Sequence, residues 1–526
     1  MLDRPSGIVP GETTISHRRP IARLKARIVA ALRSRRGGAA MALAIAAFAA
    51  AGLLVLLLGK ARQDLFMDSA EAFTWGAKFL GGYGRHPPLT GWIAGVWYRV
   101  LPPANWASFL LSSLTIAFSL AMTFLIARRV LSARRGALIA FAMMLYPLYI
   151  GAKADHFNNY QVLLALLPLT VWLFLVAWDK RTALAGAALG LAAAAATLTI
   201  YSGGLGVAAI GLAALIGRER RAFFTSPSPY VAALVFVAAL TPHLWWLFSG
   251  HDASLDYAAR YAGGAKPDRG ELYYLGRYFG QQLGLLAFPF GALAVALWPR
   301  RLRWPLRGLS GAPAGERRLV VVIAAVLVLA PLAAAVLLAL PLQPDWGNSL
   351  FFLVPVAVLA LVPGLVVTWG AVARGALLAA VWALALVVGL PVYEAVNFRL
   401  RPDYRAYEPL SELARELTTR WHERCGGKLP FVVAELEVAA PLAFYSPDHP
   451  LMMSADETMF SPWIDDPAAL RTRGFIGVCR DGDGRCAAFL HGLNPQAERF
   501  DITLARSVRG VSAGPHLFHV ELSPPR

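Results

Sequence analysis

Charged residues are scarce in this sequence. They make up 16% of the 526 residues, whereas hydrophobic residues make up 57%. Soluble proteins carry about 25% charged residues, so a soluble fold of this length would leave much of its apolar surface unburied. The composition excludes an ordinary soluble protein and favours one embedded in a bilayer.

Lysine and arginine are absent from every long apolar run. The runs are about 17–22 residues long, the length at which a helix crosses the hydrocarbon core of a membrane. We therefore expect a mainly α-helical, polytopic bundle, in which the boundary around residues 201–204 is the hardest to place. The eleven expected spans are 39–59, 108–127, 136–152, 161–178, 183–200, 202–217, 229–248, 283–298, 319–340, 350–367 and 375–394.

The net charge of +18 would suit a nucleic-acid-binding protein, but the distribution of the basic residues does not. They cluster in short connections on one side of the expected spans, as the positive-inside rule predicts. With the N-terminus inside, the inside connections hold 25 lysines and arginines, the longer outside connections hold 10, and 15 follow residue 394. We expect a bilayer and no nucleic acid as partner, and a C-terminal segment on the outer face.

No secretory signal is evident, because the first apolar run is too long for a cleaved segment and lacks a clear cleavage site. Residues 1–38 are therefore expected to form a basic cytoplasmic segment, and 39–394 the membrane domain. The bias towards alanine and arginine is typical of a bacterium, so residues 395–526 are expected to lie in the periplasm and the chain in the inner membrane.

The segment after residue 395 loses the long apolar runs and resembles a small α/β domain. Helical spacing covers 403–424, and short strand-like runs lie at 431–433, 475–478, 487–490, 500–504 and 517–520. Cys479 and Cys486 bracket an expected hairpin turn, where an outside location permits a disulfide. A metal site there is the weaker interpretation, because two more ligands would be needed nearby. Cys425 is left unpaired.

The first outside connection carries the residues best suited to chemistry. Asp68 and Glu71 are three apart and share a helix face with Trp75, a candidate platform for a sugar. Glycosyl transfer from a phosphate-activated sugar needs a carboxylate to take the acceptor's proton and donors to hold the leaving phosphate. Arg85 and His86, just before two prolines, could supply the latter. An amphipathic interfacial helix followed by a proline turn explains the same spacing equally well.

The pattern Asp-x-Ala-Glu-Ala, followed by Gly-Tyr-Gly-x-His-Pro-Pro-Leu, resembles membrane enzymes of glycosyltransferase family 39. This family belongs to the GT-C class, which includes the protein O-mannosyltransferases and the lipid A aminoarabinose transferase. The resemblance implies a polyprenyl-phosphate sugar donor and makes Asp68 the catalytic base. The family's adjacent glutamate is replaced here by Ser69, which leaves Glu71 as a candidate for the second acid.

The second outside connection places Lys153, Asp155, His156 and Asn158 directly before a span. By similarity to the family's second outside segment, Lys153 is a candidate ligand of the lipid phosphate and the other three are candidates for sugar contacts. A polar cap on two helix ends is the alternative. The Asp-His pair supplies too few ligands for a metal, and relatives differ in metal dependence, so the metal question stays open and no cofactor is assigned.

Two further arginines are candidate substrate ligands. Arg260 lies among tyrosines in the third outside connection, which suits either a loop over a sugar-phosphate pocket or an ordinary interfacial belt. Arg401 follows the last expected span, where a polyprenyl-phosphate head would lie and where a snorkelling anchor would also be found.

The sequence therefore predicts a membrane glycosyltransferase that moves a sugar from polyprenyl phosphate to a lipid, glycan or protein hydroxyl on the periplasmic face. A lipid flippase or transporter is the main alternative. Transporters usually carry charges at mid-membrane depth or paired broken helices, whereas here every lysine and arginine lies outside the expected spans and the only acid within one is Glu394, at its end. The third interpretation, suggested by Ser69, is that the protein is related to these enzymes but binds glycolipid without turnover.

Overall fold

The computed structural model describes residues 37–151, 153–251, 254–257, 269–298, 315–338, 340–456, 458, 461–464 and 468–526. The candidate ligand Arg260 and most of residues 1–38, expected to form a cytoplasmic segment, lie outside these residues.

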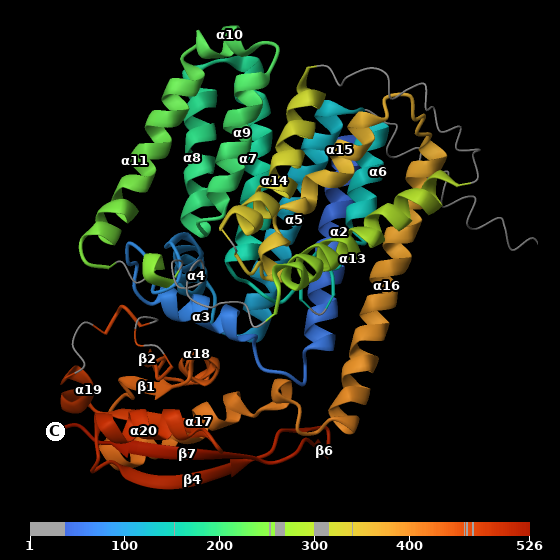
Figure 1. Cartoon of the computed structure of the whole chain (residues 1–526). Coiled ribbons are helices and arrows are strands. Elements are labelled where there is room, and N and C mark those ends of the chain that lie inside the picture. Colours follow the sequence, from blue (N-terminus) through green and yellow to red (C-terminus); the bar gives the residue numbers. More distant parts are fainter. Residues whose placement is uncertain are drawn as a thin grey trace, which may run out of the picture.

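A helical bundle forms the larger part of the molecule (Figure 1). Each of the eleven expected spans contains a helix, and seven of the described helices are long and apolar enough to cross a membrane. Those seven are α2 (Gly37–Gly59), α5 (Asn105–Val130), α7 (Asn159–Lys180), α11 (Ser228–Phe248), α13 (Glu271–Leu297), α14 (Glu316–Leu338) and α16 (Trp369–Leu400). The four shorter ones are α6 (Ala133–Met143), α8 (Ala183–Thr199), α9 (Gly203–Ile216) and α15 (Val354–Leu361).

Local sequence explains where several of these helices stop. Arg181 adopts a left-handed conformation after α7, and the Thr182 side chain then caps α8 by accepting a hydrogen bond from the Ala185 amide. Helix α6 is shorter than the expected span 136–152 because the chain turns before Pro147, which cannot continue a helix. The short helix α10 (Arg220–Phe224) lies in the connection between α9 and α11.

Two short helices lie between the bundle and the C-terminal domain. They are α3 (Met67–Gly76) and α4 (Leu89–Val100), both in the connection between α2 and α5 (Figure 1). The backbones of α3 and α4 approach closely, since a Cβ atom on Gly76 would lie only 2.5 Å from the Gly95 nitrogen. Only glycine fits at this crossing. The two helices therefore pack directly against each other between the bundle and the C-terminal domain.

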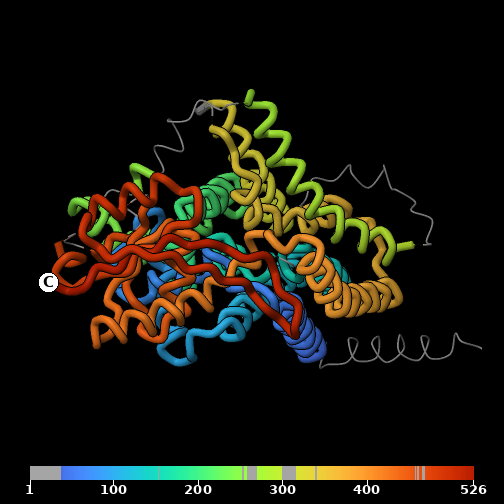
Figure 2. The backbone as a smooth tube through the Cα atoms, turned by 90° about the horizontal axis from the view of Figure 1, so that it is seen from below, coloured from blue at the N-terminus to red at the C-terminus, as the bar shows by residue number. Residues whose placement is uncertain are grey.

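The C-terminal domain is a small α/β unit, as expected. Its five-stranded sheet has the order β2-β1-β3-β7-β4, in which β1 pairs in parallel with β2 and β3, and β7 pairs antiparallel with β3 and β4. The strands are β1 (Phe431–Ala434), β2 (Leu451–Ser454), β3 (Phe475–Arg480), β4 (Glu498–Leu504) and β7 (His516–Ser523). Seen from below in Figure 2, the strands at the end of the chain run across the base of the molecule.

The helices of this domain correct two expectations. Residues 487–490 belong to α20 (Gly484–Leu493) and not to a strand, because the Asp483 side chain caps the helix at the Cys486 amide. The disulfide between Cys479 and Cys486 is present, but it joins β3 to α20 and does not close a hairpin.

The helix expected over 403–424 is α17 (Leu410–Cys425), which begins later because Pro409 precedes it. Helix α18 (Leu436–Tyr445) and strand β2 were not expected.

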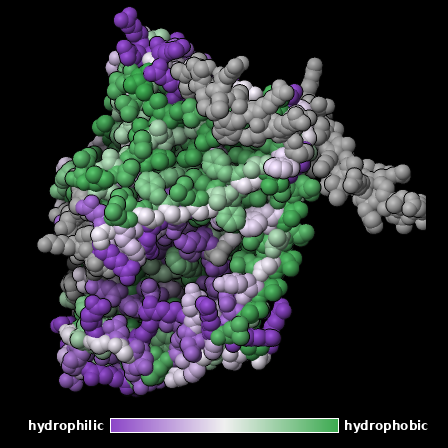
Figure 3. Space-filling model, turned by 45° about the vertical axis from the view of Figure 1, so that its right-hand side comes forward, coloured by the Kyte–Doolittle hydropathy of each residue, from purple (hydrophilic) through white to green (hydrophobic). Residues whose placement is uncertain are grey.

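The surface divides into two zones. Figure 3 shows an apolar band over the helical bundle and a hydrophilic surface over the C-terminal domain, with a hollow between them. The band has the character of a lipid-facing surface, and the hollow lies at the level where α3 and α4 separate the two parts.

The orientation predicted from the charge distribution can be tested with Cys425, which is partly exposed at the end of α17. We expect a membrane-impermeant maleimide to label Cys425 in intact spheroplasts, because the domain would lie outside. As a control, Arg218→Cys in a Cys425→Ser background places a thiol on an exposed inside position, and it should react only after permeabilisation. Labelling in the opposite pattern would show that the orientation is inverted.

Candidate active site

Most of the site residues expected from sequence line one cavity of about 400 Å³ above α3. Asp68, Glu71 and Trp75 reach it from α3, Arg85 and His86 from the connection to α4, and Asn158 from the second outside connection. The remaining wall comes from the membrane helices α7, α9, α13 and α14 and from the connections between helices, and it is mostly apolar: Asn159, Tyr160, Ile200, Tyr201, Ser202, Leu205, Tyr257, Tyr278, Pro331, Ala334, Leu340, Leu342, Trp346 and Leu350.

The Asp68 carboxylate is held by one defined partner. Asn158 Nδ2 donates a hydrogen bond to Asp68 Oδ2 at 2.9 Å, while Asn158 Oδ1 accepts from the Gln161 amide at 3.0 Å and so caps α7. One side chain therefore fixes both the start of a membrane helix and the orientation of Asp68. The amide hydrogen occupies one carboxylate oxygen and leaves the other for a substrate.

Glu71 forms a buried ion pair with Arg85. Arg85 Nη2 lies 2.7 Å from Glu71 Oε1 and 2.6 Å from Oε2, and Glu71 is only 2% exposed. Burial raises the pKa of Glu71, and the Arg85 charge opposes that rise. Ser69, which stands where the family has its second acid, points elsewhere and donates to the Asp155 carbonyl at 2.9 Å.

The aromatic residues of this loop pack on one another. Trp75 stacks on Tyr83 with ring centroids 5.2 Å apart, and His86 meets the edge of Trp75 at 5.8 Å. Trp75 is only 3% exposed, so it offers less open ring surface than a sugar platform requires. Burial, together with the Arg85 charge, lowers the pKa of His86 to about 3, which makes His86 a neutral imidazole at ordinary pH.

A second cavity of about 320 Å³ lies on the other side of Asp68. It shares Asp68, Asn158 and Tyr160 with the larger cavity, so these three side chains form the wall between the two. The rest of its lining is Phe66, Leu148, Lys153, His156, Gln161, Leu164, Asp345 and Asn348.

Lys153 and His156 both line this second cavity. Lys153 forms an ion pair there, and His156 stacks on an aromatic ring. Lys153 Nζ lies 3.1 Å from Asp345 Oδ1, which also accepts from Gln281 Nε2 at 2.8 Å. Although partial burial would raise the pKa of Asp345, these hydrogen bonds and the Lys153 charge lower it overall. The His156 ring stacks on Phe66 at 3.6 Å, and burial lowers the pKa of His156 despite the nearby Asp155.

Two of the expected ligands lie elsewhere. Asp155 lines neither cavity and is buried against Lys60 at 3.3 Å and His156 at 3.5 Å, so it orders the loop. Arg401 is exposed at the end of α16 and also lines neither cavity.

Several lining residues were given no specific role in the sequence analysis. Asn159 and Tyr160 directly follow the expected Asn158, and Asp345 stands out as an acid in an outside connection with no basic residue. Pro331 carries no such signal, because it lies in an apolar run and looks like an ordinary span residue. Tyr278 lies in the expected third outside connection, whereas the structure places it within α13. Among the described residues there is no group of three or more histidine, cysteine or acidic side chains suited to a metal ion.

The C-terminal domain contacts both ends of α3. Before the helix, Asp64 forms an ion pair with Arg506 and accepts a hydrogen bond from the Ser411 amide at 3.0 Å. After the helix, Lys78 donates to the Trp463 carbonyl at 3.0 Å. Between them, Tyr445 accepts from the Leu65 amide at 2.7 Å.

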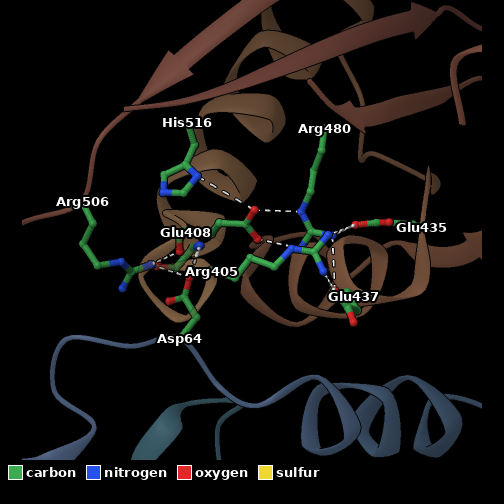
Figure 4. Close-up of polar contacts among 9 residues, drawn as sticks. Asp64, Arg405, Glu408, Glu435, Glu437, Arg480, Arg506 and His516 are labelled. Atoms are coloured by element: carbon green, nitrogen blue, oxygen red, sulfur yellow. Dashed lines mark hydrogen bonds and ion pairs between the residues drawn. The ribbon is translucent and has the colours of Figure 1, made fainter. Parts of the chain in front are cut away.

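Figure 4 shows how the Asp64 contact continues into the domain. Arg480, at the end of β3, lies 2.6 Å from Glu408 and also contacts Glu435 and Glu437. Through Asp64 and its partner Arg506, the first outside connection joins this group of ion-paired side chains.

Comparison with known proteins gives two matches that agree with this geometry. Residues 85–246 match the family model described as dolichyl-phosphate-mannose-protein mannosyltransferase. The whole structure is similar to the crystal structure of ArnT from Cupriavidus metallidurans bound to undecaprenyl phosphate, with a TM-score of 0.51 and 15% sequence identity, over 92% of this chain and 98% of that one. The chain has the GT-C fold. The search of curated proteins gave no match.

These findings confirm the resemblance and the fold class that the motifs predicted. The family model covers Arg85, His86 and the second outside connection, and it begins after Asp68. The similarity of structure extends over the C-terminal domain as well, since it covers nearly the whole of both chains.

Replacing Arg506 tests whether the domain stabilises the site. We expect Arg506→Met to lower the free energy of unfolding by about 3–5 kcal/mol, because it leaves Asp64 buried without its counter-charge. The matched change Arg499→Met, which removes a half-exposed pair with Glu521, should cost about 1 kcal/mol or less. Thermal unfolding in detergent measures both, and equal effects would contradict the buried-pair account.

The low pKa of His86 predicts an acid-sensitive stability. The unfolded chain binds a proton at His86 below a pKa of about 6.5, while the folded protein does so only near 3, so stability is full above the higher value and falls as pH drops between them. His86→Gln should therefore unfold with a shallower pH dependence between pH 6.5 and 4. His491→Gln, at an exposed position of α20, should keep the original slope.

Proposed function

We propose that this protein is a membrane glycosyltransferase that moves a sugar from a polyprenyl-phosphate donor to an acceptor hydroxyl at the periplasmic face, with Asp68 as general base. The observation that carries the proposal is the position of Asp68, whose carboxylate lies in the wall between two cavities and is oriented by Asn158. A base placed there can take the proton of a hydroxyl held in one cavity while the oxygen of that hydroxyl attacks the anomeric carbon of a donor held in the other.

The larger cavity suits the lipid-linked donor. Its wall includes apolar side chains from α9 and α14, such as Leu205 and Pro331, which can contact a polyprenyl chain within the membrane. At its outer end it contains Arg85, whose planar guanidinium is suited to a phosphate. The ArnT structure that shares this fold was solved with undecaprenyl phosphate bound, which supports the same class of donor here.

The second cavity then holds the acceptor. In the step that we propose, Asp68 removes the proton of the acceptor hydroxyl as its oxygen forms a bond to the anomeric carbon. The bond from that carbon to the phosphate oxygen breaks, and polyprenyl phosphate leaves with the electron pair. Attack from the side opposite the phosphate inverts the anomeric centre. Arg85 stabilises the charge that develops on the leaving phosphate.

Glu71 has a supporting part in this scheme. It is buried and bound to Arg85 through both oxygens, so it orients the guanidinium and does not act as a second base. This arrangement accommodates Ser69, which contacts the backbone of the second outside connection and leaves Asp68 as the acid at the boundary of the two cavities.

Donor turnover tests the proposal. Purified protein incubated with a panel of polyprenyl-phosphate sugars and total membrane lipid should release polyprenyl phosphate, and Asp68→Asn should lower the rate about 10²–10⁴-fold, the usual contribution of a general base. Asp481→Asn, an exposed acid of the C-terminal domain, should leave it unchanged. A folded protein that binds donor lipid and never releases polyprenyl phosphate would favour a flippase or a glycolipid-binding protein instead.

A further inference from the structure

The second cavity has a lining suited to hydroxyl groups. Asn158, Gln161 and Asn348 carry amide groups, Asp68 and Asp345 carry carboxylates, and these side chains all border the same space. Amides both donate and accept hydrogen bonds and carboxylates accept them. A ligand with many hydroxyl groups can pair with each of these groups in turn.

One of these polar groups is buried without a partner. Gln161 is 7% exposed, and its Nε2 donates to the Ala154 carbonyl at 3.1 Å, whereas its Oε1 has no hydrogen-bond partner among the residues that the structure describes. A buried polar atom left unpaired costs about 1–3 kcal/mol. The carbonyl oxygen therefore marks a place where a ligand hydroxyl would donate.

The same cavity has a planar, partly exposed wall. The Phe66 and His156 rings stack at 3.6 Å with an interplanar angle of only 6°, and both line the cavity. Unlike Trp75, Phe66 keeps 37% of its surface exposed. Flat apolar faces beside amides and carboxylates form a surface on which the carbon face of a sugar ring can lie.

The charges in this cavity do not suit an anionic ligand. Among the described lining residues the one lysine or arginine is Lys153, and it already pairs with Asp345 at 3.1 Å. Asp68 adds a further formal negative charge, so the described lining carries a formal charge of −1, with the His156 imidazole neutral. The described lining of the larger cavity has the same formal sum, but its cation is the planar guanidinium of Arg85, which can bind a phosphate through several N–H groups, whereas Lys153 offers a single ammonium. Placing a phosphate group beside two carboxylates would bring like charges together, which costs several kcal/mol when they are desolvated.

We propose that the second cavity selects an acceptor whose head group is an uncharged sugar or polyol and discriminates against the phosphorylated form of the same head group. This inference rests on the proposed function, since it assigns the acceptor to the cavity beside Asp68. Asp345 is a specificity residue in this account, because it neutralises the one lysine that a phosphate could otherwise reach.

A matched acceptor pair tests the proposal. The full-length protein is supplied with the donor that supports turnover and either lipid A or lipid A from which both phosphates have been removed. We expect kcat/KM for the dephosphorylated disaccharide to be at least about tenfold higher, a difference equivalent to about 1.4 kcal/mol. Equal or better use of the phosphorylated form, or transfer to serine and threonine peptides alone, would overturn the proposal and leave the glycosyltransferase function standing.

Two variants move the preference in opposite directions. Asp345→Asn frees the Lys153 ammonium and should reduce the preference for the uncharged acceptor, while Lys153→Gln should increase it. An unchanged ratio in both variants would contradict the role of these charges. Because both residues lie at the open side of the cavity, with side chains 53% and 49% exposed, neither change should prevent folding.

Acceptor binding in the absence of donor distinguishes failure of the inference from failure of the proposed function. The unmodified protein, which cannot turn over without donor, should bind the dephosphorylated disaccharide more tightly than the phosphorylated one. If the protein supplied with donor never releases polyprenyl phosphate, the proposed function fails. If it does, and the donor-free protein binds lipid A at least as tightly as the dephosphorylated form, the inference about the acceptor alone is wrong.

Discussion

The buried ion pair between Asp64 and Arg506 is the interaction on which the arrangement of the site depends. It joins the start of the catalytic connection to the C-terminal domain, four residues before Asp68. From the opposite side, Asn158 holds Asp68 against the membrane bundle. Helix α3 is therefore fixed between two bodies, neither of which would define its position alone. A carboxylate placed in this way needs little reorganisation during reaction, which is the main source of catalytic power in preorganised sites.

The two cavities differ in polarity in the same way as the two proposed substrates. A lipid-linked donor is apolar over most of its length, whereas a sugar acceptor is polar, and one environment cannot solvate both. In the proposed scheme each substrate lies in its own cavity, and the two meet where Asp68, Asn158 and Tyr160 line both. Membrane helices supply the apolar side, and the connections at 153–161 and 345–348 supply the polar side. The carboxylate lies at the boundary, where the two reacting atoms have to meet.

The sequence predicted the parts of this architecture that follow from simple rules. Long apolar runs predicted a helix within each of the eleven spans, and the spacing around Asp68 and His86 identified five residues that line the larger cavity. The errors have physical causes. Asp155 looked like a ligand because a polar loop residue and a buried loop-ordering residue have the same sequence signature. Residues 487–490 looked like a strand because the cap at Asp483 carries less signal than the apolar run after it. Tyr278 could not be recognised, because its role depends on how helices pack and not on its neighbours in the chain.

The long separation between the two members of the Asp64–Arg506 pair has a consequence for biosynthesis. Arg506 follows Asp64 by 442 residues, and at ribosomal rates this distance corresponds to roughly 20–90 s of synthesis. The bundle is made first, so during that interval the catalytic connection lacks the partner that orders it. Strand β7, in the interior of the sheet between β3 and β4, is made later still. A nascent chain thus acquires the ordered geometry around Asp68 only after the C-terminal domain has been synthesised and folded.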